Sequence, residues 1–96
     1  MTAAISCLDW IRRFGLLNSQ VKYFNTDNPT SYGLKHHIED FNRQNHGQSV
    51  SHPAYIMNGA VMVAMVVSGY RVKQATRMNV WFNISRKTLT FAMNKK

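Results

Sequence analysis

The 96-residue chain has a net charge of +8. Residues 1–40 hold four acids and four bases, which sum to zero, whereas residues 41–96 hold eight bases and no acid. With 45% hydrophobic residues the chain is predicted to fold as one small domain around a single core, and a disordered protein is excluded.

The number of cysteines indicates the redox state of the cellular compartment. Cys7 is the single cysteine, so an internal disulfide is excluded and a reducing environment is suitable. The first ten residues are too polar for a signal peptide, since Asp9 lies within them. We therefore expect a cytoplasmic protein.

A first helix is predicted over about residues 2–14. Thr2 is a suitable cap for its start, and Gly15 is a natural stop. The chain beyond is less regular: residues 21–24 are compatible with a short strand, and residues 25–29 are rich in turn formers.

A second helix is predicted to begin at Ser31 and to end before Gly47. Its apolar face carries Leu34, Ile38 and Phe41 at helical spacing. The positions expected to point outward include Lys35, Glu39, Asn42 and Arg43.

A third helix is predicted over residues 54–68, because Pro53 suits a first helical turn and Gly69 suits the end. Its β-branched residues leave a pair of strands as the alternative. The apolar run spans about 14 residues, fewer than the roughly 18 that indicate a membrane span, so a core helix without membrane contact is expected. Three small residues on this helix would permit a homodimer: Gly59, Ala60 and Ala64.

The hydrophobic period changes in the last third of the chain. Residues 71–73, 80–84 and 89–93 alternate as half-buried strands do, with loops near 74–78 and 86–88. About three helices followed by a short antiparallel hairpin or three-stranded sheet make an α+β domain, in the order of a winged-helix arrangement.

The acid-free C-terminal part predicts a surface that attracts a polyanion. On a half-buried strand pair, Trp81 and the bases at the loop tips would face outward, and cations beside an exposed aromatic ring suit a phosphate backbone. The alternative is that the bases are ordinary solvated side chains and that Trp81 packs in the core. The candidate binding residues are Lys35, Arg43, Arg71, Lys73, Arg77, Trp81, Arg86 and Lys87.

Base-specific reading is not favoured by the third predicted helix. A recognition helix presents Arg, Asn, Gln or Ser to base edges, and this helix has almost none. Contacts are instead expected from the hairpin and from Lys35, His36, Arg43 and the loop at residues 44–52. Backbone-dominated binding is therefore the prediction.

Metal binding and catalysis have weaker support. His36 lies one helical turn from Glu39 and Asp40, and imidazole binds zinc or nickel well. No cysteine pair accompanies them, and a third ligand would have to come from the loop that holds His46 and His52. No metal site and no cofactor are predicted. Without a nucleophile–base–acid set or a Gly-rich phosphate loop, a non-enzymatic protein is expected.

The pattern S-Y-x-L-K-H-x-x-E beginning at Ser31, followed by N-G at residues 58–59 and G-Y at residues 69–70, resembles small accessory proteins of phages and plasmids. The resemblance covers roughly residues 30–70. It implies a compact intracellular protein of a mobile element, of a kind that regulates transcription or inhibits a host nucleic-acid machine such as a CRISPR effector. It implies no functional residues for this chain.

Two functional hypotheses follow. The first is non-enzymatic nucleic-acid binding through the C-terminal basic hairpin, including transcriptional regulation as a dimer. The alternative is a protein-binding inhibitor of a host defence or nucleic-acid complex, of the anti-CRISPR type, whose basic face docks an acidic or nucleoprotein surface. Under the alternative, Trp81→Ala should cost more than Lys95→Ala, because binding hot spots are rich in Trp, Tyr and Arg.

Overall fold

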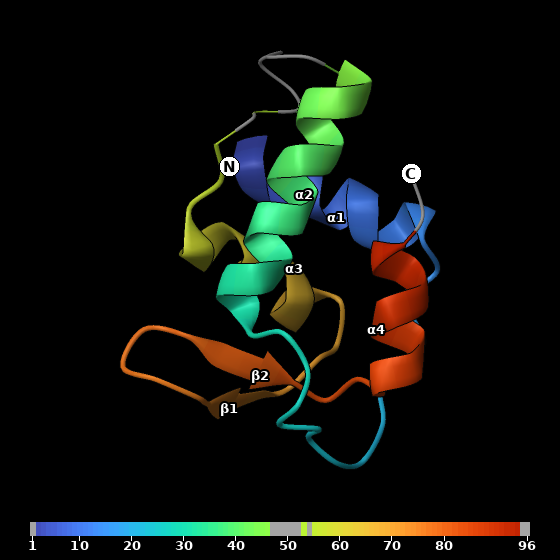
Figure 1. Cartoon of the computed structure of the whole chain (residues 1–96), viewed down its shortest axis with the longest axis vertical. Helices are drawn as coiled ribbons and strands as arrows, with labels where there is room; N and C mark the ends of the chain where they lie inside the picture. The colour runs from blue at the N-terminus through green and yellow to red at the C-terminus, as the bar shows by residue number, and fades with distance from the viewer. Residues whose placement is uncertain (1, 47–52, 54, 95–96) are drawn as a thin grey trace.

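The computed structural model describes residues 2–46, 53 and 55–94, and within these ranges the chain forms four helices and one two-stranded antiparallel sheet. The elements in chain order are α1 (Thr2–Arg13), α2 (Ser31–His46), α3 (Asn58–Val67), β1 (Val72–Gln74), β2 (Val80–Phe82) and α4 (Arg86–Met93) (Figure 1). The predicted α+β class is confirmed.

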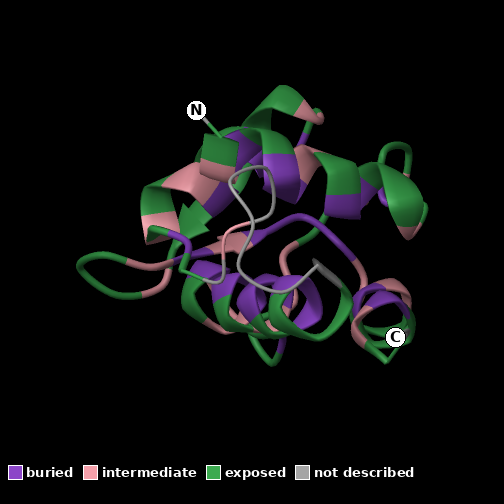
Figure 2. Cartoon of the chain, turned by 90° about the horizontal axis from the view of Figure 1, so that it is seen from above, coloured by how far each residue is buried: buried purple, intermediate pink, exposed green. Residues whose placement is uncertain are grey.

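The core lies where α3 packs against both α1 and α2 and where β2 packs against α2. Seen from above, the buried parts of the helices face one another and the exposed parts face outward (Figure 2). At the start of α2, the backbone N–H of Val80 donates to Ser31 Oγ at 3.2 Å, which fixes the hairpin to this helix. The fully buried apolar side chains include Trp10, Ile11, Leu16, Leu34, Ile38, Ile56, Val61 and Met65.

Two glycines end helices as predicted. Gly15 has φ +76°, and the N–H of Leu16 donates to the carbonyl of Ile11 at 2.9 Å. Gly69 has φ +96°, and the N–H of Tyr70 donates to the carbonyl of Met65 at 3.0 Å. Both are the left-handed helix ends that glycine adopts without a steric penalty.

Residues 21–24 do not form the short strand with which their sequence is compatible: in this part of the chain only Gln20 makes a bridge, with Ile84. The segment is held instead by Asn83, which is buried. Its Nδ2 donates to the carbonyl of Val21 at 2.9 Å, and its Oδ1 accepts from the backbone N–H of Arg71 at 2.6 Å. The backbone N–H of Val21 also donates to the carbonyl of Asn83 at 2.9 Å. One backbone hydrogen bond and the side chain of Asn83 therefore hold this segment in place of a strand ladder.

The third helix begins later than predicted, at Asn58, and Pro53 lies outside it. The residues before α3 are not helical: Ile56 is buried, whereas Tyr55 and Met57 on either side of it are exposed. The N–H of Ile56 donates to Glu39 at 2.6 Å, so this backbone group is used to bind α2 rather than to continue a helix.

Residues 53 and 55–57 also explain why part of α2 is buried, contrary to the prediction. Lys35, Glu39 and Asn42 were predicted to point outward, and all three are buried. They lie on one stripe of the helix, four and three residues apart. Asn42 Nδ2 donates to the carbonyl of Pro53 at 2.9 Å, and Glu39 binds Ile56. Residues 53 and 55–57 therefore cover this stripe, whereas Arg43 remains exposed as predicted.

The strand predicted at residues 89–93 and the loop predicted at 86–88 are wrong, because this segment is α4. Ser85 Oγ accepts from the N–H of Thr88 at 3.1 Å and caps the helix. Leu89 and Ala92 are buried at a spacing of three residues, whereas Phe91 is 63% exposed. The hairpin is therefore followed by a helix rather than by a third strand, and the winged-helix arrangement is not confirmed.

Within the described ranges, none of the helices has the length and apolar character needed to cross a bilayer.

Candidate functional site

The predicted bases divide into two groups. Arg71, Lys73, Arg77, Arg86 and Lys87 are exposed, and none of them forms a salt bridge with another described residue. Lys35 and Arg43 are both bound to acids on α2. Lys95, Lys96, residues 47–52 and the side chain of His46 lie outside the described residues.

Three of the exposed bases come from the hairpin. Arg71 directly precedes β1, and its guanidinium lies 5.9 Å from the centre of the Phe24 ring. Lys73 lies in β1 opposite Trp81 of β2. Arg77 lies in the turn between the strands, where its carbonyl accepts from Gln74 Nε2 at 3.1 Å. These cations follow the hairpin from its base to its tip.

Two other segments meet the base of the hairpin and bring further cations. Asn28 Nδ2 donates to the carbonyl of Ile84 at 2.9 Å, which holds the segment at residues 20–28 beside the start of α4. This segment carries Lys22, which is exposed and was not among the predicted residues. The hairpin, this segment and the start of α4 lie along the lower edge of the molecule in Figure 1. We call this surface the basic edge: Lys22, Arg71, Lys73, Arg77, Arg86 and Lys87.

The positive charge of the basic edge is neutralised by few acidic residues. Among the described residues, Asp27 is the one acid on the three segments that form it. Arg86 and Lys87 occupy the first turn of α4, which has no acidic residue. The N-terminus of a helix is its positive end, so two cations there oppose the helix dipole.

The prediction that Trp81 faces outward as an exposed aromatic ring is wrong. It is half-buried, and its indole N–H donates to the carbonyl of Asn28 at 3.2 Å. Val80, Phe82 and Ile84 are buried as predicted. Trp81 therefore helps to hold the segment at residues 20–28 against β2.

Lys35 is also not part of an exposed binding surface. Its ammonium lies 3.2 Å from a Glu39 carboxylate oxygen, and the two side chains are 10% and 6% exposed. Arg43 lies 2.6 Å from Asp40 on the outer face of α2. Since both cations already face carboxylates, neither belongs with the basic edge.

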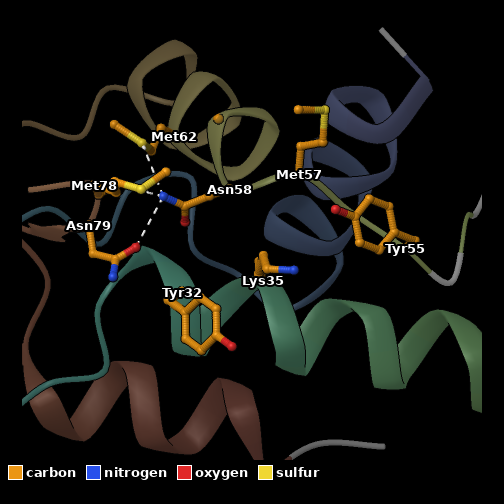
Figure 3. Close-up of a pocket in the computed structure, with 9 residues that line it drawn as sticks. Tyr32, Lys35, Tyr55, Met57, Asn58, Met62, Met78 and Asn79 are labelled. Atoms are coloured by element: carbon orange, nitrogen blue, oxygen red, sulfur yellow. Dashed lines mark hydrogen bonds between the residues drawn. The ribbon is translucent and has the colours of Figure 1, made fainter.

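A pocket of about 640 Å³ lies beside the hairpin turn. Figure 3 shows Lys35 between Tyr32 and Tyr55, with the methionines along the opposite side. The Lys35 ammonium lies 5.7 Å from the centre of the Tyr32 ring and 5.1 Å from that of Tyr55. The lining residues are Tyr32, Lys35, Tyr55, Met57, Asn58, Gly59, Met62, Met78 and Asn79.

Asn58 closes the pocket on the hairpin side. Its Nδ2 donates to the carbonyl of Met78 at 2.8 Å and to Asn79 Oδ1 at 3.2 Å. These bonds hold the hairpin turn against the first turn of α3, and so the turn becomes one wall of the pocket (Figure 3).

Two further candidates for chemistry, a histidine–acid pair and a cysteine, lie on α2 and α1. His36 Nδ1 lies 3.1 Å from Glu39. Among the described residues no group of three or more His, Cys, Asp or Glu side chains is placed to hold a metal ion. Cys7 is fully buried, and burial raises the pKa of its thiol to about 12. A thiol in this state is a poor nucleophile.

No protein-family model, curated protein or solved structure matches this chain.

The pocket was missed by the sequence-based prediction. Tyr55 and Met57 were placed on a helix, where they would not both flank a buried Ile56, and Met78 was placed in a loop of no stated role. Residues 55–57 (Tyr-Ile-Met) are all apolar, so the sequence holds no polar–apolar alternation that would show Ile56 buried between two exposed neighbours. The hydrogen bonds of Glu39 and Asn58 that form the pocket join segments 17 and 20 residues apart, and no local pattern predicts such pairs.

Proposed function

We propose that this protein is a non-enzymatic nucleic-acid-binding domain that contacts the phosphate backbone through its basic edge. The observation that supports this most is the state of the six cations. They are exposed, they form no salt bridge with a described residue, and they come from three segments that hydrogen bonds hold together. Such an arrangement of cations suits a row of phosphates.

The position of Arg86 and Lys87 adds support. Two cations in the first turn of α4 disfavour the helix, and Asp or Glu would be favoured there for stability. Residues that disfavour the local structure without stabilising another contact are typical of a functional surface. Phosphate binding near this turn would turn the unfavourable charge into an attraction, because a helix N-terminus itself favours anions.

Charge neutralisation tests the proposal. The variant Lys73→Gln/Arg77→Gln removes two cations from the basic edge, and the control Arg12→Gln/Arg13→Gln removes two exposed cations from the C-terminal end of α1. If two phosphate contacts are lost, affinity for a random-sequence duplex at about 50 mM salt should fall by on the order of 100-fold, and the salt slope should become shallower by about 2. The control should bind like the unmodified protein.

Fluorescence anisotropy with a labelled duplex measures both quantities. An equal loss of affinity in the two variants would mean that binding depends on net charge alone. The basic edge would then not be the binding surface. Retained affinity in Lys73→Gln/Arg77→Gln would contradict the proposal directly.

Binding to an acidic or nucleoprotein surface of a host complex is the second candidate. The observation that favours it is the apolar outer face of α3, where Val63, Val66 and Val67 are 51%, 52% and 67% exposed. An exposed apolar patch of this kind suits a protein partner, or a second copy of this chain in a homodimer. Absence of binding to naked duplex and single strands at low salt would favour this candidate.

A further inference from the structure

The pocket beside the hairpin turn has the chemistry of a base-binding site. Tyr32 and Tyr55 are 52% and 74% exposed, so aromatic surface is available to a ligand. Aromatic rings on which unpaired bases stack are the usual platforms of single-strand binding proteins. The pocket volume of about 640 Å³ falls within the range of small-molecule sites, which is roughly 300–1,000 Å³.

Both rings have a contact within the protein before any ligand arrives. Lys35 lies within 6 Å of both ring centres, and Glu39 fixes Lys35. The Tyr32 ring also meets the His36 ring edge-on, with centres 4.4 Å apart. Pre-positioned rings lose little conformational freedom on binding, which favours affinity.

The polar groups of the pocket are also suited to a base. Asn79 uses its Oδ1 to accept from Asn58, and its Nδ2 makes no hydrogen bond with a described residue. An amide N–H can donate to an acceptor on a base edge. The remaining walls are methionines, which adapt to flat ligands of different outline.

The pocket adjoins the basic edge directly. Met78 and Asn79 follow Arg77 in the hairpin turn, and Lys73 lies in the preceding strand. We propose that the pocket binds an unpaired nucleobase of a single strand whose phosphates contact Arg77 and the rest of the basic edge. This inference rests on the proposed function and makes it more specific. Duplex bases are stacked and paired, so the pocket predicts a preference for single strands.

An abasic strand separates base binding from phosphate binding. The probes are a labelled single-stranded oligothymidine and an abasic oligonucleotide of equal length and charge, both at about 50 mM salt. Stacking of one base should make the oligothymidine bind roughly 5- to 150-fold more tightly. Equal affinities would overturn the pocket inference and leave the proposed function standing. Absence of binding to both would overturn both.

Variants locate the effect. Tyr32→Ala/Tyr55→Ala should abolish the preference for oligothymidine and leave affinity for the abasic strand unchanged, whereas Tyr32→Phe/Tyr55→Phe should retain the preference. Phe91→Ala is the control, because Phe91 is an exposed aromatic on α4 outside the pocket lining. Loss of the preference in the control, or its retention in Tyr32→Ala/Tyr55→Ala, would contradict the inference.

A second variant fills the pocket without removing a ring. A Cβ at Gly59 would meet no heavy atom within 4 Å, so a side chain can be attached there without a clash at its first atom. Gly59→Leu should reduce the preference for the base-bearing strand, and Gly59→Ala should retain it. An unchanged preference in Gly59→Leu would place base binding elsewhere.

Discussion

A Glu39 carboxylate oxygen accepts a 2.6 Å hydrogen bond from the backbone N–H of Ile56, and the same oxygen lies 3.2 Å from the Lys35 ammonium. One acid thus joins α2 to the segment before α3 and neutralises a buried cation. Tyr55 precedes Ile56, so this contact also positions a ring of the pocket. Glu39 therefore has a structural role beside the pocket, and no acid is among the described residues that line it.

Replacement of Glu39 by Gln should destabilise the protein by about 3 kcal/mol, because it leaves the Lys35 ammonium buried without an anion. Glutamine can still accept from Ile56, so the loss reports mainly on the charge. The free energy of unfolding from urea denaturation measures the effect. A loss below about 0.5 kcal/mol, the range of ordinary surface substitutions, would show that the ion pair is not buried in solution.

The double variant Lys35→Met/Glu39→Gln provides the matching comparison. Methionine retains much of the apolar stem of lysine, and no buried charge is left unpaired. The double variant should therefore be more stable than Glu39→Gln alone. The opposite order would mean that Lys35 reaches solvent once Glu39 is neutral.

A pair of substitutions in α4 distinguishes the helix from the strand predicted at residues 89–93. Leu89 is 2% exposed and Phe91 is 63% exposed, whereas a strand would bury both on one face. Leu89→Ala should cost about 2–4 kcal/mol and Phe91→Ala less than about 1 kcal/mol. Thermal unfolding of the two variants measures this. Similar large losses from both would favour the strand.

His37 should make the protein less stable in mild acid. Burial lowers the pKa of its imidazole, an effect larger than the opposing one of Asp40. The unfolded chain, with a histidine pKa near 6.5, then binds a proton that the folded chain does not. This contribution to stability is full above about pH 7.5 and is lost as the pH falls through about 6.5 toward the lowered value of the folded state.

The variant His37→Phe isolates this group. The His37 ring packs edge-on against Trp10 with centres 5.4 Å apart, and phenylalanine can keep that contact without titrating. Urea midpoints measured between about pH 7.5 and 5.5 should fall less for His37→Phe than for the unmodified protein. Parallel curves would show that His37 is protonated equally in both states.

Local patterns predicted much of the fold. The start of α2 at Ser31, the glycine ends of α1 and α3, and the inward alternation of Val80, Phe82 and Ile84 all follow from neighbouring residues. The predictions were wrong where contacts between residues far apart in the sequence determine the structure. The alternation of Leu89, Phe91 and Met93 resembled a strand, but the Ser85 cap and the burial of Ala92 favour a helix.

The sequence predicted only part of the candidate site. Composition located the acid-free region, and the exposed bases on the hairpin and α4 follow from it. Composition could not show that Lys35 is buried, because that depends on the contacts of Pro53 and Ile56 with α2. It also could not place Lys22, which joins the basic edge through hydrogen bonds of Asn28 and Asn83 to residues 56 and 62 positions away.

Binding of the unmodified protein to a labelled single strand, titrated at several salt concentrations between about 50 and 200 mM, tests the central claim most directly. Four or more phosphate contacts predict a log–log slope of roughly −3 or steeper, and therefore a loss of affinity of on the order of 100-fold across this range. Absence of binding at the lowest salt, or an affinity that does not change with salt, would contradict phosphate recognition by the basic edge.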